Sequence, residues 1–131
     1  MQKKFTLKPT DDLPGVVLDK KEDIFIIYGR VLPEDGNKFF QPILNWVEDY
    51  VKNPNKNTEF IFRLDYYNSS TARMLTRLIV ELEKLQENNS GIKVIWEYFE
   101  EDEIMLERGE ELKSISYLPF EMRPLSEKIT I

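Results

Sequence analysis

Hydrophobic and polar positions alternate with a period of two in several runs of the chain, and these runs predict its strands. A short strand is expected at residues 5–7, and VVLDKKEDIFIIYG has two β-rich runs around the charged turn from Asp19 to Asp23, which predicts a hairpin. IKVIWEYF predicts a further strand, and LPFEMRPL a short edge strand, because prolines at both ends suit an edge. TEFIFRLDYY predicts a strand whose well-buried face carries Phe60, Phe62, Leu64 and Tyr66.

Other segments repeat their apolar residues at helical spacing and predict three helices. FFQPILNWVEDYV is the first, and Pro42 is expected in its first turn, where the missing N–H costs nothing. A second helix is expected from Thr71, with NNSG ending it and Gly91 in the left-handed position after its last turn. EEDEIMLERGEEL predicts a short helix with carboxylates at its positive end. The second helix has the longest apolar stripe, formed by Met74, Leu75, Leu78, Ile79, Leu82 and Leu85.

In chain order, these elements predict one α/β domain over residues 1–131. The order is strand, hairpin, helix, strand, helix, strand, helix, strand. A strand–helix–strand crossover makes its two strands parallel, whereas a hairpin makes them antiparallel. We therefore expect a single mixed β-sheet with an N-terminal hairpin and two strand–helix–strand crossovers.

The amino-acid composition excludes several functional classes. The 131 residues include no histidine and no cysteine, which removes the commonest general base, the commonest transition-metal ligand and all thiol chemistry. A net charge of −6 would repel the phosphates of a nucleic acid. We therefore expect no zinc site, no catalytic triad and no nucleic-acid partner.

The hydrophobic runs are too short for a membrane protein. Hydrophobic residues make up 41% of the chain, and no run approaches the roughly 20 apolar residues that a membrane-spanning helix needs. The first ten residues, MQKKFTLKPT, lack the apolar segment of about 7–15 residues found in a signal peptide. We therefore expect a cytoplasmic protein that has no membrane partner.

Four small polar residues, Asn68 to Thr71, stand between the strand predicted for TEFIFRLDYY and the second predicted helix. One of them suffices to cap a helix, and the Glu or Gln that would complete a capping box is missing at Ala72 and Arg73. Two interpretations remain. The segment is either a redundant cap, or it presents a hydroxyl that accepts a phosphate, which free backbone N–H groups at the helix start would hold.

The helix that follows this turn exposes two arginines near the candidate phosphoacceptor. Arg73 and Arg77 lie on its polar stripe, where they could pair with acidic groups of a partner protein. The alternative is an ordinary solvated helix face. We expect a partner-binding surface made of Asn68, Ser70, Arg73 and Arg77.

Two other polar groups offer rival interpretations. Asp65, near the end of an apolar strand, could be the phosphoacceptor of a receiver-like domain, or could serve with Arg63 in a small ligand-binding domain or enzyme. A receiver also needs an acidic pair after its first strand, but the acids here lie in the hairpin turn. The run from Glu100 to Glu103 could attract Mg²⁺ or Ca²⁺, although adjacent helical positions point in different directions, which favours a solvated helix start.

Several motifs, taken together, resemble those of the SiaC family of regulatory phosphoproteins. They are LPED, FFQPILNW, YYNSSTARML, IKVIWEYFEEDEIMLERGEEL and LPFE, which occur in the family's order between about Tyr28 and Glu121. The family is similar in layout to the STAS domains of anti-sigma-factor antagonists, which place a phosphorylated Ser or Thr at a strand–helix turn. The resemblance therefore implies a STAS-like fold.

The resemblance also implies a partner switch in cyclic di-GMP signalling. A dedicated serine/threonine kinase would phosphorylate the turn and a metal-dependent phosphatase would reverse the modification. The unphosphorylated form would bind and activate a signalling target, which is a diguanylate cyclase for the best-known members. The protein itself would be non-catalytic, so we expect no catalytic residue, no metal and no cofactor. The family commonly carries a threonine where this chain has Ser69, so Ser69 is the expected phosphoacceptor, with Ser70 and Thr71 as alternatives.

Overall fold

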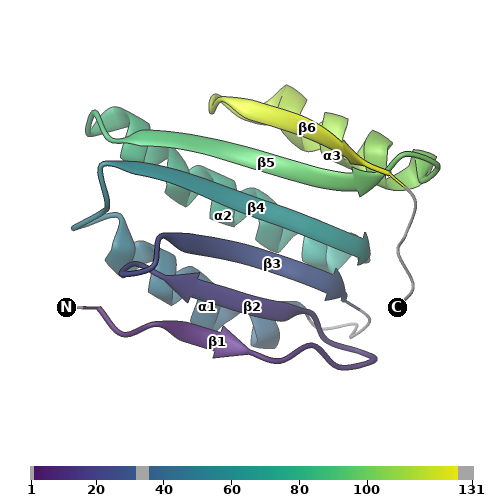
Figure 1. Cartoon of the computed structure of the whole chain (residues 1–131), viewed down its shortest axis with the longest axis horizontal. Coiled ribbons are helices and arrows are strands. Elements are labelled where there is room, and N and C mark those ends of the chain that lie inside the picture. The colour runs from purple at the N-terminus through teal and green to yellow at the C-terminus, as the bar shows by residue number, and fades with distance from the viewer. Residues whose placement is uncertain (1, 32–35, 127–131) are drawn as a thin grey trace.

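The computed structural model describes residues 2–31 and 36–126 of the chain (Figure 1). The described helices are α1 (Gly36–Tyr50), α2 (Ser69–Glu87) and α3 (Glu103–Ile115). The described strands are β1 (Phe5–Leu7), β2 (Gly15–Asp19), β3 (Ile24–Arg30), β4 (Asn57–Tyr66), β5 (Gly91–Phe99) and β6 (Phe120–Leu125). The LPED motif at 32–35 lies outside the described residues.

All six strands form one sheet in the order of the sequence, β1-β2-β3-β4-β5-β6. The β1–β2 and β2–β3 pairs are antiparallel, whereas the β3–β4, β4–β5 and β5–β6 pairs are parallel. The predicted α/β fold, mixed sheet and N-terminal hairpin are therefore confirmed. The sheet has three strand–helix–strand crossovers, one more than we expected, because the edge strand β6 returns parallel to β5 after α3.

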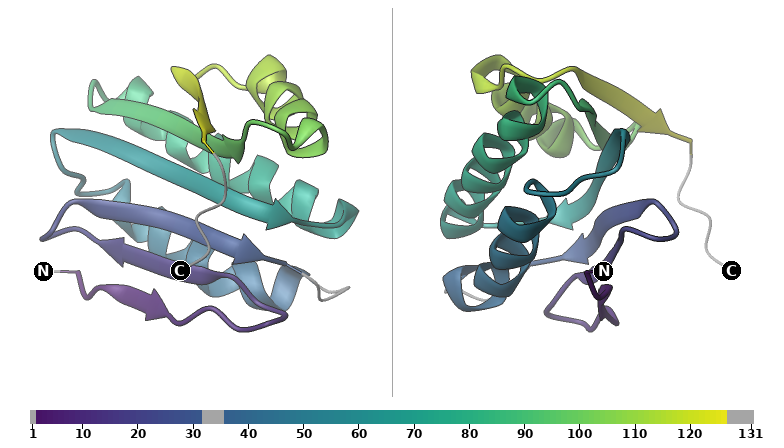
Figure 2. Two further views of the ribbon diagram at one scale, coloured as in Figure 1. Left: turned by 45° about the vertical axis from the view of Figure 1, so that its right-hand side comes forward. Right: turned by 90° about the vertical axis from the view of Figure 1, so that its left-hand side faces the viewer.

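The helices cover one face of the sheet and leave the other face open (Figures 1 and 2). Side chains at alternate positions of the strands point into the layer between sheet and helices, where Phe25, Phe60 and Trp96 are almost fully buried. Helix α2 contributes the apolar stripe that the sequence predicts, and α1 packs beside it. This two-layer arrangement keeps the strand ends accessible, and the candidate site lies at one of those ends.

Two predicted local features are wrong. Helix α1 begins at Gly36, so Pro42 is its seventh residue and lies in the second turn instead of the first. The left-handed position after α2 is taken by Asn89 (φ 63°), a residue type that tolerates this conformation, whereas Gly91 begins β5 opposite Asn57. A Cβ atom at Gly91 would lie 2.2 Å from the Asn57 side-chain oxygen, so this glycine permits a close approach between strands.

A β-bulge changes the faces of the last residues of β4. Gly29 pairs with Leu64 but Arg30 pairs with Tyr66, so that β4 has one extra residue between these pairs. The strict alternation predicted for this strand consequently fails at its end: Tyr66 is 48% exposed and Tyr67 is 2% exposed. The bulge therefore sets which aromatic ring reaches the surface next to the polar turn.

Candidate functional site

The polar turn lies where β4 passes into α2, at the carboxyl end of the parallel strands. Asn68 has extended backbone dihedrals (φ −97°, ψ 179°) and is the N-cap of α2, whose first residue is Ser69. The Asn68 side-chain oxygen accepts hydrogen bonds from the Thr71 backbone N–H at 3.1 Å and from the Ser70 hydroxyl at 2.8 Å. Helix α2 thus begins two residues before the predicted start at Thr71, Ser69 is its first residue, and Asn68 supplies the cap.

The three hydroxyls of this turn differ in exposure. Ser69 is exposed, and Ser70 is half-buried with its hydroxyl bonded to Asn68. Thr71 is fully buried (0% exposed), and its hydroxyl oxygen has no hydrogen-bond partner in the described part of the chain. A kinase acting on the folded protein would therefore reach Ser69 most easily.

Arg73 and Arg77 are both exposed, on successive turns of α2. Ser69 and Arg73 are four residues apart, so their side chains are neighbours on the helix surface. Arg77 lies a further turn away and directs one guanidinium nitrogen towards the sulfur of Met74 at 3.8 Å. The expected partner-binding residues thus share one end and one side of α2, with Arg73 nearer to the hydroxyl.

Two residues near the turn could not be selected from the sequence. The Tyr66 ring is exposed only because of the β-bulge, which no local pattern reveals. Arg108 of α3 stacks on the ring of Tyr67 at 4.9 Å from the ring centroid. Burial raises the pKa of the Tyr67 phenol to about 12, although the Arg108 charge and its hydrogen bond to the phenol act in the opposite direction. Arg108 therefore ties α3 to the end of β4.

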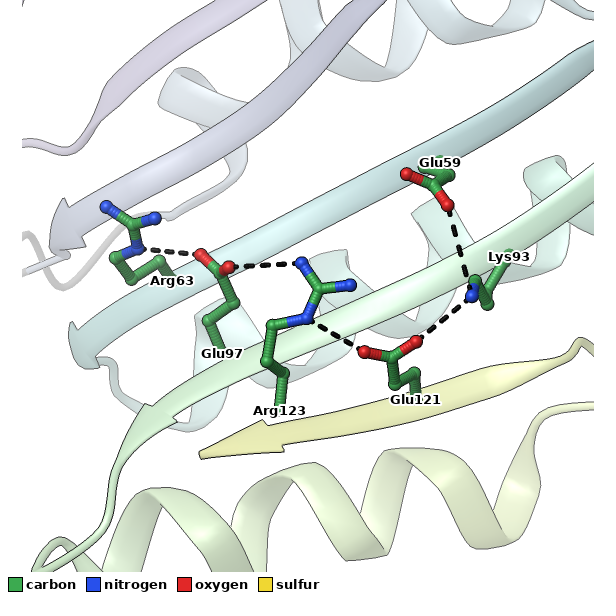
Figure 3. A network of polar contacts seen from close by, with 6 residues as sticks. All are labelled: Glu59, Arg63, Lys93, Glu97, Glu121 and Arg123. Atoms are coloured by element: carbon green, nitrogen blue, oxygen red, sulfur yellow. Dashed lines mark hydrogen bonds and ion pairs between the residues drawn. The ribbon is translucent and has the colours of Figure 1, made fainter. Parts of the chain in front are cut away.

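Arg63, one of the rival functional residues, belongs to an ion-pair network on the open face of the sheet (Figure 3). Its Nε atom lies 2.7 Å from Oε1 of Glu97, a carboxylate on β5 whose side chain is 7% exposed. The other oxygen of Glu97 lies 3.5 Å from Nη1 of Arg123 on β6. The Glu97 charge is thus shared between two guanidinium groups, and Arg63 is already occupied by a structural partner.

The network extends along β6 and back to β4. Glu121 accepts hydrogen bonds from Lys93 at 3.0 Å and from Arg123 at 2.8 Å, and Lys93 also lies 3.9 Å from Glu59. These bonds from Lys93 and Arg123 hold the pKa of the Glu121 carboxyl below its usual value. Three carboxylates and three cations therefore balance one another on this face, an arrangement that joins β4, β5 and β6.

The acids that a receiver-like site would need do not meet Asp65. Asp65 is half-buried near the carboxyl end of β4, whereas Asp23 lies in the β2–β3 turn at the opposite end of the sheet. Asp23 accepts a hydrogen bond from the Asn55 side chain at 3.0 Å, and Asp19 accepts one from the Glu22 backbone N–H. These contacts hold the hairpin turn and give Asp65 no acidic neighbour from it.

The acidic run from Glu100 to Glu103 leads into α3, whose first residue is Glu103, so it marks the start of a helix as the sequence favours. Asp102 is the N-cap, and its carboxylate accepts the Met105 backbone N–H at 3.1 Å. Glu100, Glu101 and Glu103 are exposed.

Among the described residues, no helix is both long and apolar enough to cross a membrane.

Comparison with known proteins identifies the family. A protein of Pseudomonas aeruginosa strain UCBPP-PA14, of uncharacterised function, is 23% identical over 111 residues, which cover 85% of this chain and 88% of that protein. The structure of SiaC of Pseudomonas aeruginosa matches with a TM-score of 0.84 at 20% identity, over 94% of this chain and 99% of that one. A chain in the crystal structure of the diguanylate cyclase SiaD in complex with its activator SiaC also matches, with a TM-score of 0.85 at 21% identity. The match covers 92% of this chain and 99% of that one. Since the model of the SiaC family of regulatory phosphoproteins matches residues 7–125, nearly the whole chain, this protein belongs to that family.

Proposed function

We propose that this protein is a cytoplasmic, non-catalytic partner switch controlled by phosphorylation of Ser69. A serine/threonine kinase modifies Ser69, a phosphatase restores the hydroxyl, and only the unmodified form binds and activates a signalling target. The observation that carries the proposal is the position of Ser69, which is exposed at the first residue of α2. Family membership supports the regulatory role.

The target proposed here is a diguanylate cyclase. SiaC, which shares the fold of this chain, is the activator of the diguanylate cyclase SiaD and forms a complex with it. The surface that would face the target comprises the Asn68–Ser70 turn with Arg73 and Arg77, extended by the exposed ring of Tyr66. Aromatic and arginine side chains are the types that most often dominate interface energies.

Phosphorylation would act at this interface and not by unfolding the protein. A phosphate adds about −1.5 to −2 charge at pH 7, and at a helix N-terminus it meets free N–H groups and the positive end of the helix dipole. The fold thus tolerates it. A partner that packs against the Ser69 hydroxyl would instead have to desolvate a dianion, and a loss of about 2.7 kcal/mol already lowers affinity about a hundredfold.

The proposal is tested with protein that carries phosphoserine at position 69, introduced during translation so that modification is complete. Affinity purification of the tagged chain from its native cell, with phosphosite mapping, supplies the target and the modified residue. Binding of that target is then compared for phosphoserine 69, unmodified protein and Ser69→Ala. We expect at least about a hundredfold weaker binding for the phosphorylated form only.

Phosphoserine at position 70 is the matched control, because Ser70 is adjacent but half-buried and bonded to Asn68. A phosphosite found at Ser70 or Thr71, or equal target affinities for phosphorylated and unmodified Ser69, would refute the assignment of Ser69. A recovered target that synthesises no cyclic di-GMP would refute the proposal that the target is a diguanylate cyclase. The phosphorylation switch would then still be tested by comparing the affinities of phosphorylated and unmodified protein for that target.

A further inference from the structure

Nearly all of the net charge of the chain comes from one segment. Residues 100–115, which form the start and body of α3, contain seven carboxylates and two cations, so they carry −5 of the chain's net charge of −6. One of the two cations, Arg108, is stacked on Tyr67. The outer surface of α3 is therefore strongly acidic, while the rest of the molecule is close to neutral.

The same helix exposes large apolar side chains. Ile104 is 65% exposed and Ile115 is 58% exposed, and both are on α3. They are eleven residues apart, which is close to three helical turns, so they lie on one side of the helix with Glu107 and Glu111 between them. This stripe combines apolar ends with acidic centre positions, unlike a face that is only solvated.

Helix α3 has its main contacts with the sheet and not with another helix. Arg108 stacks on the ring of Tyr67, which directly follows β4, so α3 also lies against the end of that strand. Helix α2 packs against α1 and β5, whereas α3 packs on β5, β6 and β4, so no helix packs extensively on α3 in the described part of the chain.

Tyr117, just after α3, presents its ring from a fixed backbone. Its N–H donates to a carboxylate oxygen of Glu83 at 3.0 Å and its carbonyl accepts from the Gln86 side chain at 3.2 Å, so two residues of α2 hold the peptide groups on either side. The side chain is nevertheless 84% exposed. An aromatic ring on a fixed backbone loses only its side-chain freedom on binding, which is a property of an interface anchor.

We propose that Ile104, Glu107, Glu111, Ile115 and Tyr117, here called the α3 surface, form a second protein-docking site, which binds a basic amphipathic segment of a partner. Apolar side chains of that segment would cover the two isoleucines and the tyrosine ring, and its Lys or Arg side chains would pair with the glutamates. This site is distinct from the Ser69 turn, and its occupation does not depend on phosphorylation.

Charge decides the class of partner. Clusters of exposed apolar residues mark interaction surfaces, but they do not by themselves say what binds. Anionic lipid headgroups and nucleic-acid phosphates would be repelled by the carboxylates of the α3 surface, and a second copy would bring two such surfaces together. A basic and apolar protein segment is complementary in both respects.

A fluorescein-labelled peptide of about 15 residues, with leucine and lysine arranged at helical spacing, serves as the probe. Its binding to the full chain is measured by fluorescence anisotropy, beside a peptide with glutamate in place of lysine and a scrambled peptide of equal composition. We expect binding of the amphipathic basic peptide only, weakened several-fold when salt is raised from about 50 to about 300 mM.

Matched variants locate the peptide. The double substitution Ile104→Ser with Ile115→Ser is expected to weaken binding at least about tenfold, while Ile24→Ser, which removes a 45% exposed isoleucine from the sheet, changes it less than about twofold. Glu107→Lys with Glu111→Lys is likewise compared with Glu48→Lys with Asp49→Lys, an equal change of charge on exposed positions of α1. Circular dichroism confirms that each variant is folded.

Two results would overturn the proposal. One is failure of the basic amphipathic peptide to bind the unmodified chain more tightly than its scrambled form does. The other is equal loss of affinity in the α3 and control variants, which would show attraction to overall charge only. Ser69→Ala is measured in parallel and should bind the peptide as the unmodified chain does. Because the two sites are tested separately, loss of the docking proposal would not decide for or against the Ser69 switch.

Discussion

Gly109 of α3 lies directly against the indole ring of Trp96, so closely that a Cβ atom on the glycine would come within 2.4 Å of Cδ1 of the ring. One turn earlier in the helix, the Met105 carbonyl oxygen accepts the Trp96 indole N–H at 2.9 Å. Since Trp96 is fully buried in β5, these contacts set the distance between α3 and the sheet. The position of the acidic helix thus depends on a residue without a side chain.

Gly109→Ala is therefore expected to lower the free energy of unfolding by about 1–2 kcal/mol, because overpacking outweighs the better helix propensity of alanine. Urea denaturation measures the change. Ser114→Ala, at an exposed position of the same helix, is the control and should stay within about 0.5 kcal/mol of the unmodified chain. An increase in stability for Gly109→Ala would show that α3 can move away from Trp96 at no cost.

The order and type of the elements could be predicted because each depends on local periodicity. The contrast between the alternating residues before Tyr66 and the helical stripe after Thr71 also located the polar turn and placed Ser69 at its helix start. What could not be predicted depends on contacts between distant residues. The pairing of Gly29 with Leu64, which precedes the bulge and leads to an exposed Tyr66, has no signal in either strand alone.

The polar network on the open face of the sheet could not be predicted either, because it also depends on contacts between distant residues. Arg63 and Glu97 are 34 residues apart, and their ion pair follows from the register of β4 against β5, so the sequence left Arg63 open as a functional residue. Gly91, which the sequence predicts in the left-handed position after α2, instead lies opposite Asn57, where a Cβ atom would clash with the asparagine side chain. In each case the deciding partner belongs to another element.

Asn68→Ala is expected to destabilise the protein by about 1 kcal/mol, because the Thr71 N–H and the Ser70 hydroxyl lose their acceptor. Asn68→Asp should keep most of the stability, since aspartate is an equally good N-cap. Both changes are measured as free energies of unfolding. Equal losses for Ala and Asp would mean that the Asn68 side chain acts through its amide nitrogen and not as a cap.

Arg63→Ala is expected to cost about 1–3 kcal/mol, because it leaves the nearly buried Glu97 with only the more distant Arg123. The loss should be below that of a fully buried pair, since Arg63 is 44% exposed and partly screened by water. Glu97→Gln in the Arg63→Ala background should recover part of the stability. No recovery in that double variant would argue that Arg63 acts by packing instead of charge.

Stability should fall at high pH because of Tyr67. Its pKa is about 12 in the folded protein against an ordinary value of 10.0, so the unfolded chain releases this proton first and stability is lost as pH rises above 10. The loss amounts to about 1–3 kcal/mol by pH 12. Tyr67→Phe should flatten the slope between about pH 10 and 12, leaving the smaller contribution of Tyr50, whose pKa burial also raises. An unchanged slope in Tyr67→Phe would contradict this assignment.

Phosphoserine at position 69 is expected to leave the fold intact and to raise the free energy of unfolding by about 0.3–1 kcal/mol at low salt. The reason is that the phosphate meets the free N–H groups at the start of α2 and the guanidinium of Arg73, which lies four residues on along the exposed side of the helix. Urea denaturation of the stoichiometrically phosphorylated protein measures the gain.

Two arginine variants test how much of that gain in stability comes from Arg73. Arg73→Gln should remove part of it, whereas Arg77→Gln, on an exposed position one turn further along, should retain it. Raising the salt concentration should weaken the Arg73 share, because the pair is exposed. If phosphorylation instead lowered the stability by more than about 1 kcal/mol, a target could be released by local unfolding of the turn, and the interface mechanism proposed for Ser69 would have to be abandoned.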